Sequence, residues 1–223
     1  SRRQPGLRRT VGTQQAGDRR LDGEPAADIA AEVGCRPVPV GDRVPGLVED
    51  VVSRWTAAVR AHASAHPAEE GAPAPRDGAP LMPYGATLLA AAAMESALVV
   101  LQIGDGDILV GFDDGRLVRP LPRDEGLVGE QTYSLCMPGA ERYFHTTVLS
   151  REEADPVFVM ASTDGVSKSF PSDRGFEGVA NDYFELARTV GLQKVAGDIP
   201  GWLGELTARG SGDDVTLAFL SRA

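Results

Sequence analysis

The chain has little cysteine, no long apolar run and no excess of basic residues. Its two cysteines, Cys35 and Cys136, fit neither a disulfide framework nor a metal-binding spacing, so we expect reduced thiols and a cytoplasmic location. No apolar run approaches the roughly 18 residues that a membrane-spanning helix needs. The opening residues show no signal-peptide pattern. We therefore expect no membrane partner.

The charge balance excludes another class of partner. The net charge is −10 at pH 7, and binding to phosphate backbones needs clustered basic residues, so no nucleic-acid partner is expected. The acidity favours solubility, and part of it is available for metal binding. With 223 residues, of which 42% are hydrophobic, the chain is long enough for one domain with a substantial core.

Three short apolar runs each have an aspartate and a glycine at one end. Such runs, bounded by turn residues, favour strands over helices, and glycine lets the backbone turn sharply. The three aspartates and their neighbouring runs are Asp105 after Leu98–Ile103, Asp164 after Val157–Met160, and Asp213 before Val215–Leu220. Three such strand ends can bring their carboxylates together over one edge of a β core. Hard divalent cations select that kind of oxygen-rich site.

These motifs occur in the order and approximate spacing of a known family. They are Tyr84–Thr87, Ile103–Gly106, Ser162–Gly165 and Gly210–Thr216, and the segment Gly129–Leu135 also fits the pattern. Together they resemble the metal-dependent protein phosphatase 2C family, and most closely its bacterial branch. Any one Asp-Gly pair is a common turn, but the ordered set is fairly specific. The resemblance extends over residues 45–221.

The resemblance implies a fold and an activity. The fold would be α+β, a four-layer sandwich of two antiparallel β-sheets flanked by α-helices. Residues 1–44 would form a divergent, partly irregular segment, and residues 45–223 the phosphatase 2C-like domain. The implied reaction is hydrolysis of phosphoserine or phosphothreonine in a phosphorylated protein substrate, with a cognate Ser/Thr kinase as the opposing enzyme.

The resemblance also implies the site. Asp164 and Asp213 match metal ligands, and Asp105 matches an acidic position near an additional metal. The cofactors would be two or more Mn²⁺ or Mg²⁺ ions. A metal-activated water would be the nucleophile, so no side chain is expected to act as one. Asp214 stands where the family often has Asn and is not counted as a ligand.

The first half of the expected metal site is not recognisable in the sequence. The family would place two early aspartates here, and the chain offers Asp18 and Asp22. No apolar strand precedes Asp22, and the two lie too close together for the pattern. No arginine for the substrate phosphate can be assigned, although Arg19 and Arg20 are available. A pseudophosphatase, which keeps the fold as a binding or regulatory module without the full metal site, therefore stays open.

Apolar periodicity predicts the remaining elements. Leu47–Ala63, Phe176–Val190 and Asp198–Ala208 are expected to be helices, the last with Pro200 near its start. A further helix is expected at Ala26–Val33, and irregular structure over residues 1–25 and 67–82.

Strands are expected over residues 86–112, adjacent and antiparallel, with the small-residue run Ala86–Met94 buried on both faces. A hairpin turn is expected at residues 113–116, and a further strand at Arg142–Leu149. Within that strand, His145 is more typical of a packed or surface side chain than of a catalytic one. His62 and His66, four apart, are expected on the surface at a helix end rather than around a metal.

Overall fold

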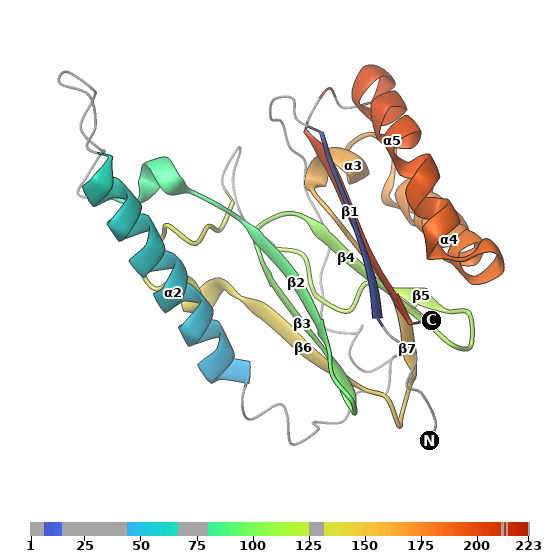
Figure 1. The fold of residues 1–223 in the computed structure, drawn as a ribbon, viewed down its shortest axis with the longest axis horizontal. Coiled ribbons are helices and arrows are strands. Elements are labelled where there is room, and N and C mark those ends of the chain that lie inside the picture. The colour runs from blue at the N-terminus through green and yellow to red at the C-terminus, as the bar shows by residue number, and fades with distance from the viewer. Residues whose placement is uncertain are drawn as a thin grey trace.

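The computed structural model describes residues 7–14, 44–66, 80–124, 132–210, 212 and 214–222. Its four layers are visible in Figure 1: helix α2 (Val44–Ala65) lies outside one antiparallel sheet, while α4 (Asp173–Val190) and α5 (Leu192–Arg209) lie outside the other. The architecture is the expected α+β sandwich.

The larger sheet has the strand order β1-β8-β7-β4-β5. Its strands are β1 (Leu7–Gln14), β4 (Asp107–Phe112), β5 (Leu117–Val118), β7 (Pro156–Ser162) and β8 (Val215–Arg222). All of its neighbouring strands are antiparallel.

The smaller sheet has the order β2-β3-β6. Its strands are β2 (Leu88–Ala93), β3 (Ala97–Ile103) and β6 (His145–Ser150). Three short helical segments complete the described fold: η3 (Met82–Tyr84), η4 (Ala140–Tyr143) and α3 (Asp164–Ser167). None of the described helices is long and apolar enough to cross a membrane.

Strand β3 explains how the layers are joined. Every residue of its sequence ALVVLQI is buried, because it is the middle strand of its sheet and both of its faces are covered. Leu98 and Val100 face the other sheet, while Val99 and Leu101 pack with α2. A nearly continuous apolar run is the pattern expected of such a doubly covered strand.

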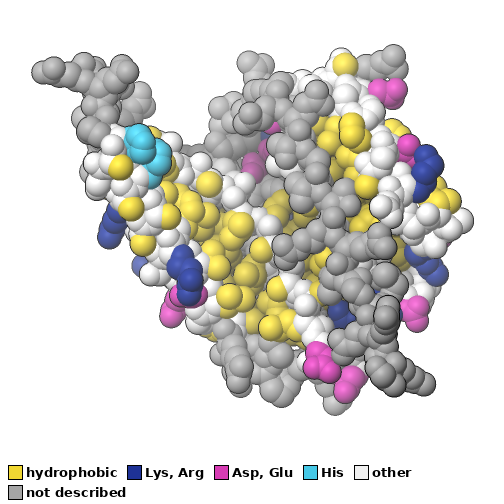
Figure 2. Space-filling model, viewed as in Figure 1, with side chains coloured by type: hydrophobic (Ala, Val, Ile, Leu, Met, Phe, Trp, Pro, Cys, Tyr) yellow, Lys and Arg dark blue, Asp and Glu magenta, His cyan; other side chains and the backbone are white. Residues whose placement is uncertain are grey.

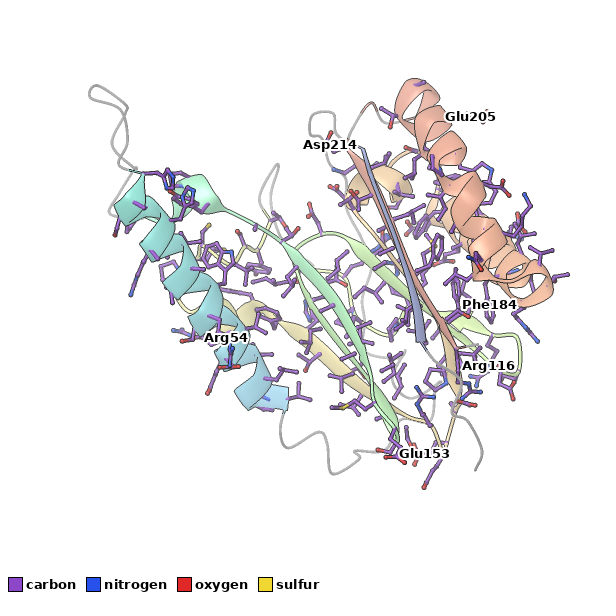
Figure 3. All side chains as sticks on the ribbon, in the orientation of Figure 1. Arg54, Arg116, Glu153, Phe184, Glu205 and Asp214 are labelled. Atoms are coloured by element: carbon purple, nitrogen blue, oxygen red, sulfur yellow. The ribbon has the colours of Figure 1, made fainter. Side chains whose placement is uncertain are left out.

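Helices α4 and α5 cover one face of the larger sheet and pack against the alternate strand residues that point to that face. Phe158 and Met160 of β7, with Phe219 of β8, face these helices and pack in one core with Phe184 of α4. Ser172 caps α4 by accepting a hydrogen bond from the Gly175 amide (3.3 Å). Figure 3 shows Phe184 pointing from α4 toward the sheet.

Several sequence predictions are confirmed and others are wrong. The expected strand Arg142–Leu149 starts later, at His145, and the hairpin at residues 113–116 joins β4 to β5. However, β3 and β4 are not neighbours: β3 pairs with β2, and β4 lies in the other sheet beside β7. The turn between them therefore crosses from one sheet to the other, which local pattern does not reveal.

Three further expectations need correction. β2 is an edge strand whose residues are intermediate in burial or exposed, so the expected burial on both faces is wrong. Pro200 lies inside α5 rather than near its start, because the helix begins at Leu192. The irregular structure expected over residues 1–25 is wrong for Leu7–Gln14, which form strand β1 paired along its length with β8. The rest of that segment, most of segment 67–82 and the expected helix Ala26–Val33 lie outside the described residues.

The surface seen in Figure 2 is apolar in its middle and charged toward its rim. The apolar part runs over α2 and the smaller sheet, whose edge strand β2 is only partly buried. The exposed large apolar side chains of the described residues include Leu47 on α2 (40% exposed), Met82 of η3 (57% exposed) and Met94 after β2 (49% exposed).

Candidate active site

Strand register brings the predicted site residues to one edge of the larger sheet. The first residue of β4, Asp107, is opposite the last residue of β7, Ser162. Ser162 is in turn opposite Leu217, near the start of β8. Because the pairs are antiparallel, the turn before β4, the turn after β7 and the turn before β8 meet at the same edge. β1 also reaches this edge, since Gln14 is opposite Val215.

Thr163 fixes the position of Asp164 beside β8. The Thr163 amide donates to the Thr216 carbonyl (3.1 Å), and the Thr216 amide donates back to Thr163 Oγ1 (2.9 Å). The same hydroxyl donates to the Asp214 carbonyl (3.2 Å). These bonds hold α3, which begins at Asp164, against the start of β8, where Figure 3 labels Asp214. Asp213 itself lies outside the described residues.

Asp105 stands on the crossing turn between the two sheets. Gly104 has φ +97°, a left-handed conformation that a side chain would strain, so glycine is needed there. The buried Gln102 side chain donates to the carbonyls of Gly104 (2.9 Å) and Gly106 (2.6 Å). The side-chain amide of β3 therefore holds the turn on both sides of Asp105.

The carboxylates of Asp105 and Asp164 act on each other. The pKa of Asp105 is raised above its ordinary value, first by partial removal from water and second by the negative charge of Asp164. The positive charge of Lys168 opposes this shift. The two carboxylates are thus near enough for the charge of one to act on the other.

Lys168 is a cation at this edge that the sequence analysis did not single out. Its Nζ contacts Asp164 Oδ2 at 2.5 Å, and both side chains are largely buried, with 15% and 24% exposed. Its backbone amide also donates to the Asp164 carbonyl (2.9 Å), so the two residues are separated by one helical turn. In the sequence, the position of Lys168 four residues after Asp164 was the feature that could have indicated the pair, because side chains at this spacing are neighbours on a helix.

The donors at this edge fit a divalent cation. Asp105 and Asp164 supply carboxylate oxygens, and the repulsion between them would be relieved by a positive ion. Asp214 Oδ1 is buried without a hydrogen-bond partner among the described residues, but Asp214 does not complete a group of three ligands with Asp105 and Asp164. Within the described ranges no three acidic, histidine or cysteine side chains already form a metal-binding group, and Asp213 is not among the residues searched.

The three histidines occupy different settings. His145 Nε2 lies 2.5 Å from Oδ1 of Asp124, a carboxylate of which 8% is exposed, so this histidine is a packed and paired side chain. His62 and His66 are both exposed and stack on each other, with ring centroids 4.2 Å apart. His62 Nδ1 also lies 3.2 Å from the Tyr84 hydroxyl.

A second charged group lies on the helix-facing side of the same edge. Asp107, 3% exposed, is paired with Arg119 and lies 3.4 Å from Arg123 Nη2. Arg123 also reaches Asp173 at the start of α4, at 2.5 Å. This network ties the chain after β5 to α4, and the sequence analysis did not single it out because its members are far apart in the chain.

Comparison with known proteins decides the family. The family model described as Protein phosphatase 2C matches residues 29–203. The chain belongs to the protein phosphatase 2C family. The family assignment makes it a protein serine/threonine phosphatase. A search of curated protein sequences finds no match.

Solved structures share the fold. The Mycobacterium tuberculosis serine/threonine phosphatase PstP/Ppp has a TM-score of 0.54 and 15% identity, covering 97% of this chain and 98% of that one. The catalytic domain of PstP in complex with two manganese ions gives 0.53 and 16%, covering 96% and 97%. PppA, a regulatory component of T6SS in Pseudomonas aeruginosa, gives 0.53 and 14%, covering 99% of each chain.

Proposed function

We propose that the chain hydrolyses phosphoserine and phosphothreonine in proteins with the help of Mn²⁺ or Mg²⁺ held by Asp164 and Asp213, with Asp105 nearby. The observation that carries this proposal is the strand register at one sheet edge, which sets Asp164 beside the start of β8 and close to the turn of Asp105. The family assignment supplies the substrate class.

The chain's own residues would position the reaction. Divalent ions bound by carboxylates lower the pKa of a coordinated water and neutralise charge on a phosphoryl group. Thr163 would fix the distance between the Asp164 and Asp213 segments, because its hydroxyl bonds the backbone of both Asp214 and Thr216. Gln102 would keep Asp105 in place through the carbonyls on either side of it. We expect no side chain to act as a nucleophile.

The relatives support the metal and the type of partner. One structural neighbour carries two manganese ions, and a second is named as a key regulatory component of T6SS. For this chain we propose a phosphorylated protein substrate and an opposing Ser/Thr kinase. β1 ends at this same edge, where Gln14 is opposite Val215.

The test is hydrolysis of a phosphothreonine peptide by the full chain. We expect phosphate release with millimolar Mn²⁺ and none after EDTA treatment, with activity restored when Mn²⁺ is returned. Asp198→Ala is the matched acidic control, because Asp198 pairs with Lys194 on the exposed surface of α5, and it should behave like the wild type. A folded wild-type chain that neither binds Mn²⁺ nor hydrolyses the peptide would instead support a pseudophosphatase.

A further inference from the structure

Among the described residues, Asp164 pairs with a lysine, although a metal ligand is expected to face a metal. The chain contains two lysines, Lys168 and Lys194, among 22 basic residues. Lys168 Nζ lies 2.5 Å from Asp164 Oδ2, and its charge also acts on Asp105. One of the two lysines therefore lies within the acidic group at this sheet edge.

The setting makes this ion pair stronger than a surface pair. The Lys168 side chain is 15% exposed and Asp164 is 24% exposed. Ion pairs between exposed groups contribute little, whereas a charge that loses its partner in a partly buried site is costly. Any ion that takes the Asp164 carboxylate must therefore compete with a held ammonium group.

We propose that Lys168 is an internal cation of the metal site: it holds Asp164 in the metal-free protein, and a divalent ion must displace it to bind. Lys168 then sets the concentration of Mn²⁺ at which the site fills. This inference rests on the proposed function, because it takes Asp164 as a ligand.

Charge counting gives the direction of the effect. With Lys168 in place, the described group of Asp105, Asp164 and Lys168 carries less negative charge than its two carboxylates alone. A divalent ion is attracted less strongly to that group, and the ammonium and the ion repel each other at short range. Removing the lysine charge should increase metal affinity even though it removes a contact.

The α5 helix supplies a matched control. Lys194 Nζ lies 2.9 Å from Asp198 Oδ2, again at a spacing of four residues, but Lys194 is 64% exposed. Lys194→Met removes the same charge and the same kind of pair outside the acidic group. It controls for net charge and for the loss of a helical ion pair.

The experiment is a calorimetric titration of Mn²⁺ into the metal-free full chain. For Lys168→Met we expect a Kd at least about tenfold lower than that of the wild type. Lys168→Gln, which can still donate a hydrogen bond to Asp164, should shift in the same direction and serves if the methionine variant folds poorly. The Kd of Lys168→Arg for Mn²⁺ should stay closer to that of the wild type, and the Kd of Lys194→Met should equal the wild-type value. Melting temperatures in EDTA check that each variant is folded.

The outcomes separate this inference from the proposed function. If the wild type hydrolyses the phosphopeptide with Mn²⁺ but Lys168→Met and Lys168→Gln bind Mn²⁺ no more tightly, the inference is wrong and the proposed function stands. Unchanged Mn²⁺ affinity with a raised KM for the peptide would also overturn it, and would indicate that Lys168 binds the substrate. If the wild type binds no Mn²⁺, gain of binding in the Lys168 variants supports the inference, and continued absence of binding overturns it.

Discussion

The two sheets of the sandwich are covered to very different extents. Helices α4 and α5 share one core with the larger sheet, and this core contains sixteen buried residues among those described. Helix α2 contributes three buried residues, Val44, Val48 and Val59, and packs through smaller clusters. The strand that leads to Asp164, β7, belongs to the densely packed half. The half that positions the candidate ligand is thus the half with the larger cluster of buried apolar residues.

The more densely packed half of the sandwich is the half that supports the candidate site. Catalytic groups must be held in a fixed geometry, and rigid, well-packed elements do this better than lightly packed ones. β7 and β8 are neighbours inside the larger sheet, so the segments of Asp164 and Asp213 share one support. Asp105 is on the crossing turn and depends on both halves. Changes in the α4–α5 half should therefore damage the site more than equal changes under α2.

The largest effect is expected at the site itself. Asp164→Ala and Asp213→Ala should each lower phosphatase activity by at least about 10²-fold, because even residues that only support metal ligands cost up to that much. The same variants should lose most of their Mn²⁺ affinity in a calorimetric titration. Melting temperatures in EDTA should show that both proteins remain folded.

His145→Ala is the comparison for these two variants. His145 pairs with Asp124, and the proposed reaction needs no base from a side chain, so activity should fall much less. A loss as large as that of Asp164→Ala would contradict the proposed division of roles and would place the His145–Asp124 pair in the reaction.

Within the packed half, Phe184 should carry the largest stability effect. Its ring is fully buried and lies 5.1 Å from the ring of Phe158, measured between centroids. Phe184→Ala should lower the free energy of unfolding by about 3–5 kcal/mol, through lost burial and the cavity that remains. Urea denaturation measures this value. A loss below about 1 kcal/mol would mean that the sheet and α4 are not packed as described.

The two halves can be compared directly with one substitution. Val195 on α5 is 0% exposed and Val48 on α2 is 5% exposed, so Val→Ala removes the same groups from each helix. We expect a loss of about 2 kcal/mol at Val195 and about 1 kcal/mol at Val48, where neighbouring groups can relax more easily. Urea denaturation measures both losses in the free energy of unfolding. Equal losses would show that α2 is held as firmly as α5.

The smallest expected effect is on folding stability at high pH, and it comes from Tyr183. Burial, and secondarily the charge of Asp182, raise the pKa of Tyr183 from 10.0 to about 12. Because the folded-state pKa is raised, the contribution of the protonated phenol to stability is full below pH 10 and is lost as the pH rises from 10 through 12. Tyr183→Phe should remove this part of the alkaline loss of stability. An absorbance titration of tyrosinate in both proteins tests it, and an unchanged titration curve would contradict it.

Much of the fold could be predicted because it is encoded locally. The strand that leads to Asp164, the hairpin at residues 113–116 and the helix over Phe176–Val190 all follow from apolar period and turn residues. The ordered Asp-Gly motifs led to the family, which the family model confirms.

The parts that failed depend on contacts between distant segments. Nothing in Leu98–Phe112 indicates that β3 and β4 belong to different sheets, because both are equally apolar. The network of Asp107 with Arg119 and Arg123 likewise needs the tertiary structure. Lys168 is different, since its spacing from Asp164 was visible in the sequence, but only the burial of the pair makes it significant.

The most direct test of the central claim is anomalous diffraction from crystals of the full chain soaked in Mn²⁺. We predict manganese peaks within about 2.0–2.6 Å of carboxylate oxygens of both Asp164 and Asp213, at the edge where β4, β7 and β8 meet. Manganese peaks at His62 and His66 instead, or no peak in well-diffracting crystals at millimolar Mn²⁺, would contradict the account.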